Sequence, residues 1–192
     1  MSNTPAKSRG FYIMKFIELD MAGCYLIKPS IIVDIRGSFV KTLNREIFEK
    51  KGLCSEFEEE YFSISKKNVL RGMHFQKPPY DHVKLVYCLD GCVEDVFLDI
   101  RKNSETYLKH QKIELESETR GILYLPKGIA HGFLTKSDSA TMVYKTSSCY
   151  APWQDDGILW DSFGAKWSCD HPIISSRDTS FSGIHNYSSP FV

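Results

Sequence analysis

The sequence predicts an all-β protein, a jelly-roll β-barrel with one short peripheral helix. From Tyr61 onward, short segments rich in Val, Ile, Leu, Phe and Tyr are separated by turn residues at strand-like intervals. Many short antiparallel strands in one domain favour a jelly roll or a closed barrel, because closure removes the exposed edges of a sheet. Such a barrel has an interior that can hold a ligand.

One helix is predicted ahead of these strands. Asn44 is a residue type that caps helix N-termini, and Ile47 and Phe48 supply an inward-facing side. Gly52 stands where a left-handed residue commonly ends a helix. The pattern predicts a short helix over Arg45–Lys51 at the periphery of the fold.

Strands are predicted at regular intervals after the helix. Asp90-Gly91 separates the second and third strands and is a tight hairpin signal. Glu94–Ile100 carries apolar residues on both faces, with Phe97 opposite its neighbours, as expected where both faces of a strand matter. The predicted strands are Val69–Phe75, Lys84–Leu89, Val93–Ile100, Gln111–Leu115, Gly121–Leu125, Gly132–Lys136 and Thr141–Ser147.

Length and composition exclude several classes of function. The 192 residues suit one domain, which we place at 13–192, with residues 1–12 as a disordered tail. Lys plus Arg (24) equals Asp plus Glu (24), so no basic field favours nucleic acid or an anionic membrane as a partner. No apolar run approaches the length of a membrane span, and the six cysteines form no CxxC pair. We expect a cytoplasmic protein with free thiols.

The densest cluster of reactive residue types is the segment from Arg71 to Gln76. In a regular strand, Arg71 points to one face while Gly72, His74 and Gln76 point to the other. Arg71 and His74 can therefore reach one pocket only if Gly72 marks a bulge or a bend. A neutral histidine backed by a carboxylate can act as a general base, but from spacing alone a histidine held in the barrel wall is equally supported for His74.

Metal binding is the main competitor to base catalysis. Many small barrels bind a metal through a His-x-His pair, and here Gln76 replaces the second histidine. His82 lies in a proline-containing loop, where we expect it to be exposed. His74 and His131 alone are fewer ligands than a catalytic zinc needs. No nucleophile motif, phosphate loop or dinucleotide fingerprint is present, so the sequence predicts neither a metal nor a cofactor.

Several motifs, in this order and separation, resemble the deoxythymidine-diphosphate-4-dehydrorhamnose 3,5-epimerase family over about Gly23 to Asp178. The resemblance implies a cupin-type jelly roll, usually dimeric, that acts on a nucleoside-diphosphate 4-keto-6-deoxyhexose without metal or cofactor. The matching segments are Asp34-Ile-Arg36-Gly37, Val69-Leu-Arg71-Gly-Met-His74-Phe-Gln76, Lys84-Leu-Val86, Asp99-Ile-Arg101-Lys-Asn-Ser104, Pro126-Lys-Gly128-Ile-Ala-His131-Gly-Phe133, Tyr144-Lys145-Thr146 and Gly157-Ile-Leu-Trp160.

The resemblance also implies roles for single residues. His74 matches the base, Asp178 the carboxylate paired with it, Tyr144 the acid on the opposite face and Lys84 the cation at the enolate oxygen. A base, an acid and a cation are what proton removal next to a ketone requires. The candidate substrate-binding residues are Arg36, Lys41, Glu59, Tyr61, Arg71, Gln76, His131, Asp155 and Arg177.

The chain departs from the family pattern at two places. Glu59-Glu60-Tyr61 stands where Gln-Asp-Asn is typical, and Lys41 stands where a Glu is frequent. The acidic pair would repel phosphate and accept hydrogen bonds from base amino groups, which favours cytidine or guanosine carriers over thymidine.

The predicted activity is inversion at C3, C5 or both, in deoxysugar biosynthesis for a surface polysaccharide or a natural product. Two alternatives stay open at this point. One is an isomerase of the same fold that moves the ketone between C4 and C3, and the other is a barrel that binds a nucleotide sugar without turnover.

Overall fold

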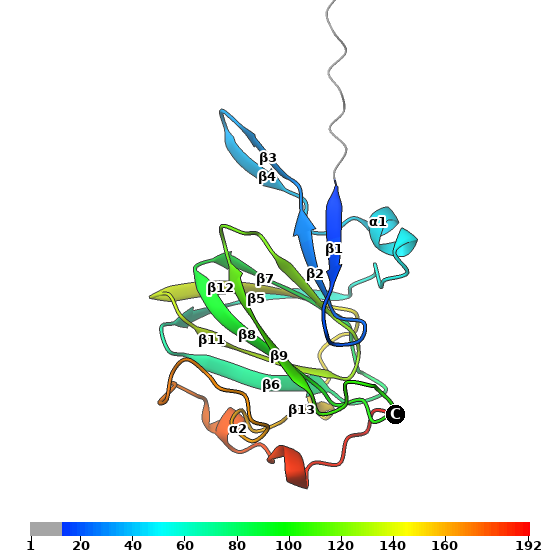
Figure 1. Ribbon diagram of the computed structural model, residues 1–192, viewed down its shortest axis with the longest axis vertical. Coiled ribbons are helices and arrows are strands. Elements are labelled where there is room, and N and C mark those ends of the chain that lie inside the picture. The colour runs from blue at the N-terminus through cyan, green and yellow to red at the C-terminus, as the bar shows by residue number, and fades with distance from the viewer. Residues whose placement is uncertain (1–12) are drawn as a thin grey trace, which may run out of the picture.

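The computed structural model describes residues 13–192, so the predicted tail over 1–12 lies outside the described residues. Within them, two antiparallel sheets face each other and a small hairpin projects from one end (Figure 1). Strand order is β1-β2-β10-β7-β12-β5 in the six-stranded sheet and β13-β6-β11-β8-β9 in the five-stranded sheet. The all-β prediction is confirmed.

The strand bounds of the six-stranded sheet are β1 (Met14–Glu18), β2 (Tyr25–Pro29), β5 (Glu59–Lys66), β7 (Lys84–Asp90), β10 (Ile122–Leu125) and β12 (Ser139–Thr146). Those of the five-stranded sheet are β6 (Leu70–Gln76), β8 (Cys92–Asp99), β9 (His110–Glu116), β11 (Ile129–Thr135) and β13 (Asp155–Gly157). The projecting hairpin is β3 (Ile31–Asp34) and β4 (Gly37–Val40), and the helices are α1 (Arg45–Lys50), α2 (Ser176–Thr179) and the 3-10 turn η1 (Ile184–Asn186).

The two sheets pack through their inner faces and are not closed into a barrel. Val86 of β7 and Met142 of β12 lie in one buried cluster with Phe97 of β8 and Phe133 of β11. No strand pairing joins the two sheets among residues 13–192, so the jelly roll is an open sandwich. The predicted jelly roll is confirmed, whereas closure of its sheets is not observed.

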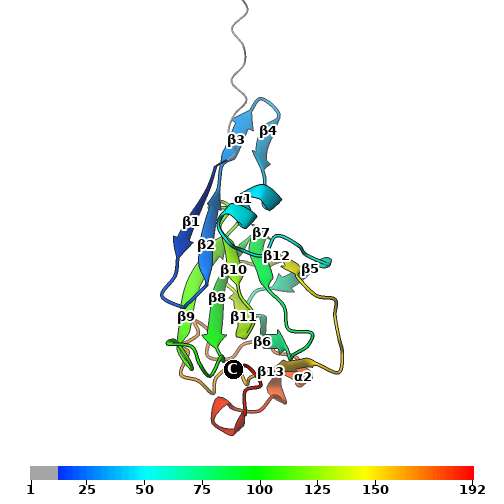
Figure 2. The ribbon, with the colours of Figure 1, turned by 90° about the vertical axis from the view of Figure 1, so that its right-hand side faces the viewer.

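The outer face of each sheet is covered by a different part of the chain. Helix α1 places Phe48, with no exposed surface, over the six-stranded sheet, and the C-terminal segment places Ile184 and Phe191 against the five-stranded sheet (Figure 2). Both faces of β8 are therefore buried, as its sequence predicts: Val96, Leu98 and Ile100 pack outward and Phe97 inward.

Local signals around α1 are confirmed and the one at Asp90-Gly91 is partly wrong. The side chain of Asn44 accepts a hydrogen bond from the Ile47 backbone N–H at 3.2 Å, and Gly52 has φ of +75°. Gly91, at φ of +83°, makes the predicted tight turn. The strands it joins, β7 and β8, lie in different sheets, so the turn carries the chain across the sandwich and makes no hairpin.

No helix within residues 13–192 is long and apolar enough to cross a bilayer.

Candidate active site

A cavity of about 480 Å³ opens between the two sheets. One wall is the six-stranded sheet, which contributes Glu59, Tyr61, Ser63, Lys84, Tyr144 and Thr146. The other wall is the five-stranded sheet, which contributes Arg71, His74, Phe75, Gln76, His131, Phe133 and Asp155. The remaining lining residues are His82, Ser148, Tyr150 and Arg177. Most of the predicted site residues therefore meet in one cavity.

A bulge in β6 lets Arg71 and His74 line the cavity together. His131 pairs with His74 and Phe133 with Arg71, so three steps along β6 match two steps along β11. Gly72 sits in the bulge with φ of +139°, and a Cβ there would lie 2.5 Å from the Cα of Gly132. Only glycine fits this close approach. The bulge predicted at Gly72 is confirmed.

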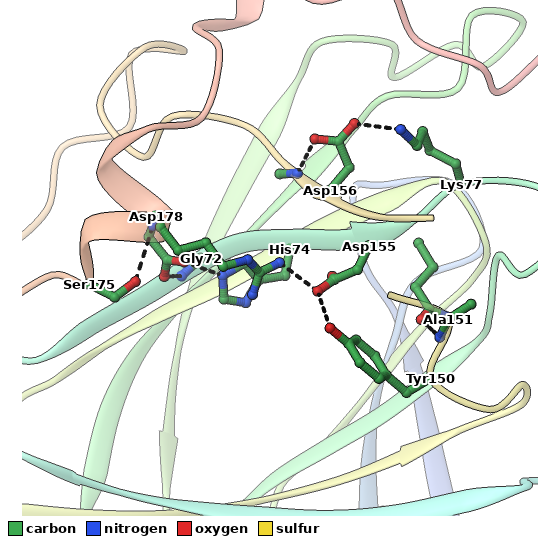
Figure 3. Close-up of polar contacts among 12 residues, drawn as sticks. Gly72, His74, Lys77, Tyr150, Ala151, Asp155, Asp156, Ser175 and Asp178 are labelled. Atoms are coloured by element: carbon green, nitrogen blue, oxygen red, sulfur yellow. Dashed lines mark hydrogen bonds and ion pairs between the residues drawn. The ribbon is translucent and has the colours of Figure 1, made fainter. Parts of the chain in front are cut away.

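His74 is backed by a buried carboxylate. Its Nε2 lies 2.9 Å from Oδ1 of Asp178, which is carried by α2 (Figure 3). The second oxygen, Oδ2, accepts the Gly72 backbone N–H at 3.1 Å, and Ser175 caps the helix by accepting the Asp178 backbone N–H. The carboxylate is thus fixed from two sides, and its side chain is only 5% exposed.

The electrostatics keep His74 neutral and Asp178 ionised. Burial lowers the pKa of His74, with Lys84 and Arg177 acting in the same direction and Asp178 opposing them. Burial would raise the pKa of Asp178, but its hydrogen bonds to His74, Gly72 and Ser175 outweigh burial and leave that pKa lowered. An Nε2–H that donates to Asp178 leaves the lone pair on Nδ1, so His74 can accept a proton.

Tyr144 lies on the opposite wall. Its hydroxyl is 3.2 Å from Oγ of Ser63, and its ring stacks on Tyr61 with centroids 4.9 Å apart. Burial raises the pKa of Tyr144, so the phenol keeps its proton through the neutral range. A buried, protonated phenol facing a neutral histidine across a cavity can serve as a proton donor.

Lys84 supplies a buried positive charge between these groups. It is 6% exposed, and its Nζ donates to the carbonyl oxygen of His74 at 3.1 Å. Burial lowers its pKa to about 8, with Asp155 and Asp95 opposing that shift. The remaining ammonium hydrogens can stabilise a negative oxygen in the cavity.

A second histidine–carboxylate pair consists of His131, which lines the cavity, and Asp95, which does not. Nε2 of His131 is 2.8 Å from Oδ2 of Asp95, and the two side chains are 4% and 0% exposed. Burial raises the pKa of Asp95, while His131 and Lys84 oppose that shift. An aspartate inside an apolar strand was the available signal for this pair, and the sequence prediction did not assign Asp95 to the site.

Polar side chains at the cavity mouth form a hydrogen-bond network. Asp155 accepts from Arg177 at 2.7 Å and from the Tyr150 hydroxyl at 3.2 Å (Figure 3). Gln76 accepts the Ala151 backbone N–H at 2.6 Å. The loop after β12 is thereby tied to β6 and β13, which keeps Arg177 at the rim of the cavity.

Two candidate residues lie away from this cavity. Arg36 sits on the projecting hairpin, 85% exposed, with Asp34 as its partner, and Lys41 follows β4. Glu60, which the sequence prediction grouped with Glu59, pairs with Lys145 and does not line the cavity. Glu59 lines it and accepts the Tyr150 backbone N–H at 3.0 Å.

The sequence prediction also missed some contacts. His82 is half-buried and lines the cavity, so the expectation that it is exposed is wrong. Phe181 packs edge-on against His74, with centroids 5.8 Å apart. Neither Phe181, in a polar tail, nor Ser63, in a strand, carries a signal in the sequence. Among the described residues, no group of three or more His, Cys, Asp and Glu side chains is arranged to hold a metal.

A jelly roll with a histidine–aspartate pair on one wall of its cavity and a protonated tyrosine on the other has the parts of a proton-transferring isomerase. The profile of the family described as dTDP-4-dehydrorhamnose 3,5-epimerase matches residues 18–186. The chain belongs to this family. It is a sugar-nucleotide epimerase of the isomerase class, with a place in deoxysugar biosynthesis.

Relatives and solved structures agree with this assignment. The chain is 39% identical over 168 residues to the dTDP-4-dehydrorhamnose 3,5-epimerase of Shigella flexneri, which covers 86% of this chain and 93% of that protein. A 3,5-epimerase from Legionella pneumophila, solved with dTDP-4-keto-L-rhamnose, superposes with a TM-score of 0.89 at 29% identity, covering 94% and 99% of the two chains. A 4-keto-6-deoxy sugar epimerase from Streptomyces spheroides gives 0.85 at 31% identity, covering 90% and 88%.

Proposed function

We propose that this protein inverts C3, C5 or both in a nucleoside-diphosphate 4-keto-6-deoxyhexose, by removing a proton next to the ketone and returning one to the opposite face. His74 takes the proton from carbon, and Asp178 stabilises the imidazolium that forms. The electrons of the broken C–H bond pass into an enolate, whose oxygen receives a hydrogen bond from Lys84. Tyr144 then donates its proton to the same carbon from the other side.

One observation carries this proposal: His74 and Tyr144 project from different sheets into the same cavity. A base and an acid on a single wall would remove and return protons on one face of the sugar ring, which restores the original configuration. Groups on opposite walls reach opposite faces. The separation of the two residues between sheets is thus the geometry that inversion requires.

Solvent exchange tests this reaction directly. In D2O, the wild-type protein is expected to place deuterium at C3 or C5 of a 4-keto-6-deoxyhexose and to form the epimer. His74→Ala should abolish both, because it removes the proposed base and leaves Asp178 without an imidazole to support. Unchanged exchange in His74→Ala would show the base assignment to be wrong. A product with its ketone at C3 would identify a ketoisomerase, and saturable binding without exchange would identify a binding protein.

We propose thymidine diphosphate as the carrier, because related epimerases from Bacillus anthracis and Legionella pneumophila were solved with TDP and with dTDP-4-keto-L-rhamnose bound. The sequence alone favoured other nucleotides because Glu59 and Glu60 are acidic. Glu60 is turned away from the cavity toward Lys145, and one oxygen of Glu59 already accepts a backbone N–H, so the repulsion of phosphate is smaller than that pattern implies. Arg71 and Arg177 are the cationic side chains at the cavity that suit a diphosphate.

Thermal unfolding with nucleotides tests the carrier. Because a ligand that binds only the folded state raises its apparent stability, dTDP is expected to raise the Tm more than UDP, CDP or GDP at equal concentration. A larger shift with CDP or GDP would overturn this choice of carrier and leave the epimerisation chemistry untouched.

We further propose a homodimer in which the β3–β4 hairpin of one protomer reaches the cavity of its partner. The hairpin extends away from its own sandwich (Figures 1 and 2), and Ile31, Val33, Ile35 and Phe39 are exposed on it. Exposed apolar residues on a projecting element favour burial against another chain. Arg36 and Lys41 would then act on the partner's substrate.

Mixing two variants tests this arrangement. In a mixed dimer of His74→Asn and Arg36→Glu chains, one site carries both changes and the other carries neither if Arg36 acts across the interface. Such a dimer is expected to recover up to about half of the wild-type activity. If Arg36 acts within its own chain, every site keeps one defect and mixing restores nothing.

We also propose a domain organisation and a cellular location for this protein. Residues 13–192 are proposed to act as one domain, since all three buried clusters belong to the two facing sheets and the segments that cover them. A cytoplasmic location is proposed because all six cysteines are free, as is usual in a reducing compartment.

A further inference from the structure

Tyr61 stands beside the proposed proton donor without being required by the proton-transfer scheme. Tyr61 on β5 and Tyr144 on β12 are direct partners in the antiparallel register. Their rings lie 4.9 Å apart, centroid to centroid, with 17° between their planes. Tyr61 is 45% exposed and lines the cavity, whereas Tyr144 is 8% exposed. Tyr61 therefore covers one face of the donor ring and separates it from solvent at the cavity mouth.

Tyr144 belongs to the main buried cluster, and its stack on Tyr61 is closer than its contact with the His131 ring. Within residues 13–192, the Tyr144 hydroxyl has Ser63 as its one hydrogen-bond partner, at 3.2 Å, and Ser63 comes from the same strand as Tyr61. His131 approaches the ring edge-on at a centroid distance of 6.4 Å, near the outer limit for such pairs. A stacked aromatic pair is stabilised beyond the effect of its buried area, so this stack favours one position of the Tyr144 ring.

We propose that Tyr61 is a positioning residue that holds the phenol of Tyr144 against the face of the sugar opposite His74, and so sets how often the enolate is reprotonated with inversion. This inference rests on the proposed function. Two fates compete for the enolate carbon. Tyr144 O–H can transfer its proton, forming the inverted C–H bond and a tyrosinate that solvent reprotonates. Alternatively, the His74 imidazolium can return a proton to the original face, after exchange of that proton with solvent.

The two fates are distinguishable because only the first changes configuration. In D2O, return from His74 gives deuterated starting sugar, and donation from Tyr144 gives deuterated epimer. The ratio of epimer to deuterated starting sugar therefore reports the placement of Tyr144, while the sum of both reports proton removal by His74. A structural role of Tyr61 in β5 alone would change the sum and not the ratio.

Three variants at position 61 test the inference. Tyr61→Phe keeps the ring, so we expect it to keep the wild-type ratio within about twofold. Tyr61→Leu and Tyr61→Asn remove the ring and should each lower the ratio about tenfold, which corresponds to about 1.4 kcal/mol in the competition between the two transition states. Asn is typical of the family at this position, so a loss in Tyr61→Asn would be a property of this chain, in which Tyr144 is stacked on a tyrosine. Thermal unfolding of each variant checks folding, and the exposure of Tyr61 makes all three substitutions tolerable.

Each outcome decides a separate question. An unchanged ratio in both ring-less variants, or an equal loss in Tyr61→Phe, would overturn the positioning role while the wild type still exchanges and inverts. A wild type that neither exchanges nor inverts would instead overturn the proposed function. Retention of the ratio in Tyr61→Phe with loss in Tyr61→Leu and Tyr61→Asn would support the inference.

Discussion

Nε2 of His74 lies 2.9 Å from Oδ1 of Asp178, although 104 positions separate the two residues in the sequence. The contact joins a strand of the sandwich to a single-turn helix in the C-terminal segment. Since Asp178 is nearly buried and also accepts the Gly72 backbone N–H, its charge is fixed against the imidazole ring. The proposed base and its carboxylate therefore form one unit.

Asp178→Asn is expected to lower the rate of deuterium exchange about 10²–10⁴-fold, the range typical of general acid–base catalysis. The amide keeps the shape of the side chain but does not stabilise the imidazolium. Exchange at C3 and C5, followed by NMR, measures the loss. A variant that folds and exchanges at the wild-type rate would remove Asp178 from the mechanism.

Activity is expected to fall on both sides of neutrality. Protonated His74 cannot accept a proton, so the rate drops as pH falls through the pKa of His74. Burial lowers this pKa from 6.5, so the acidic limb of the pH–rate profile lies below pH 6.5. Burial lowers the pKa of Lys84 to about 8, so the stabilising charge is lost as pH rises past about 8. Profiles of kcat/KM against pH measure both limbs.

Lys84→Arg tests whether Lys84 causes the alkaline limb of the pH–rate profile, because a guanidinium stays charged throughout this pH range. The alkaline limb should move to higher pH in this variant, and the acidic limb should stay in place. An alkaline limb that does not move would mean that a group other than Lys84 titrates there.

Gly72→Ala is expected to destabilise the fold by about 3 kcal/mol or more, because the added Cβ would meet the Cα of Gly132 at 2.5 Å on a backbone with φ of +139°. Gly164→Ala is the matched control. Gly164 has φ of +83° with nothing within 4 Å, so this change should cost about 1–2 kcal/mol from backbone strain alone. Urea unfolding measures both, and equal losses would argue against the close approach of β6 and β11.

Asp95→Ala should lower the free energy of unfolding by about 3–5 kcal/mol, since it leaves His131 buried without its carboxylate partner and removes one of the two carboxylates that favour the buried Lys84 charge. Asp138→Ala removes an ion pair with Lys67 in which Asp138 is 99% exposed, and should cost less than about 1 kcal/mol. Chemical denaturation compares the two variants. A loss below about 1 kcal/mol for Asp95→Ala would show that the buried pair contributes little to stability.

The sequence predicts those parts of the fold whose signals are local. Asn44 and Gly52 mark the ends of α1, and a glycine between Arg71 and His74 marks the bulge that brings both to the cavity. Asp90-Gly91 shows how far such signals reach: they specify a tight turn, but the pairing of its flanking strands depends on long-range packing. The prediction missed β1 to β5 and β13. Among these, β3 and β4 give no signal because their apolar residues are exposed and follow no inward–outward alternation.

Prediction of the site has a similar limit. The order of motifs shared with the family proposes His74, Lys84 and Tyr144 for the site, but spacing alone leaves His74 equally compatible with a structural role. Ser63 and Phe181 contact the proposed acid and base from positions that no local pattern distinguishes. Their places become visible only when β5 pairs with β12 and the C-terminal segment returns to β6.

The carboxylate that supports His74 comes from the C-terminal segment and from none of the strands that build the two sheets. Every described strand ends by Gly157, whereas Asp178 follows on α2. Loss of the Asp178 carboxylate alone would keep both walls of the cavity, Arg177 and the apolar cover from Ile184 and Phe191, yet it would remove the charge proposed to make His74 a base. A natural substitution at this single position is therefore expected to yield a nucleotide-binding but silent protein, detectable by ligand-induced stabilisation without deuterium exchange.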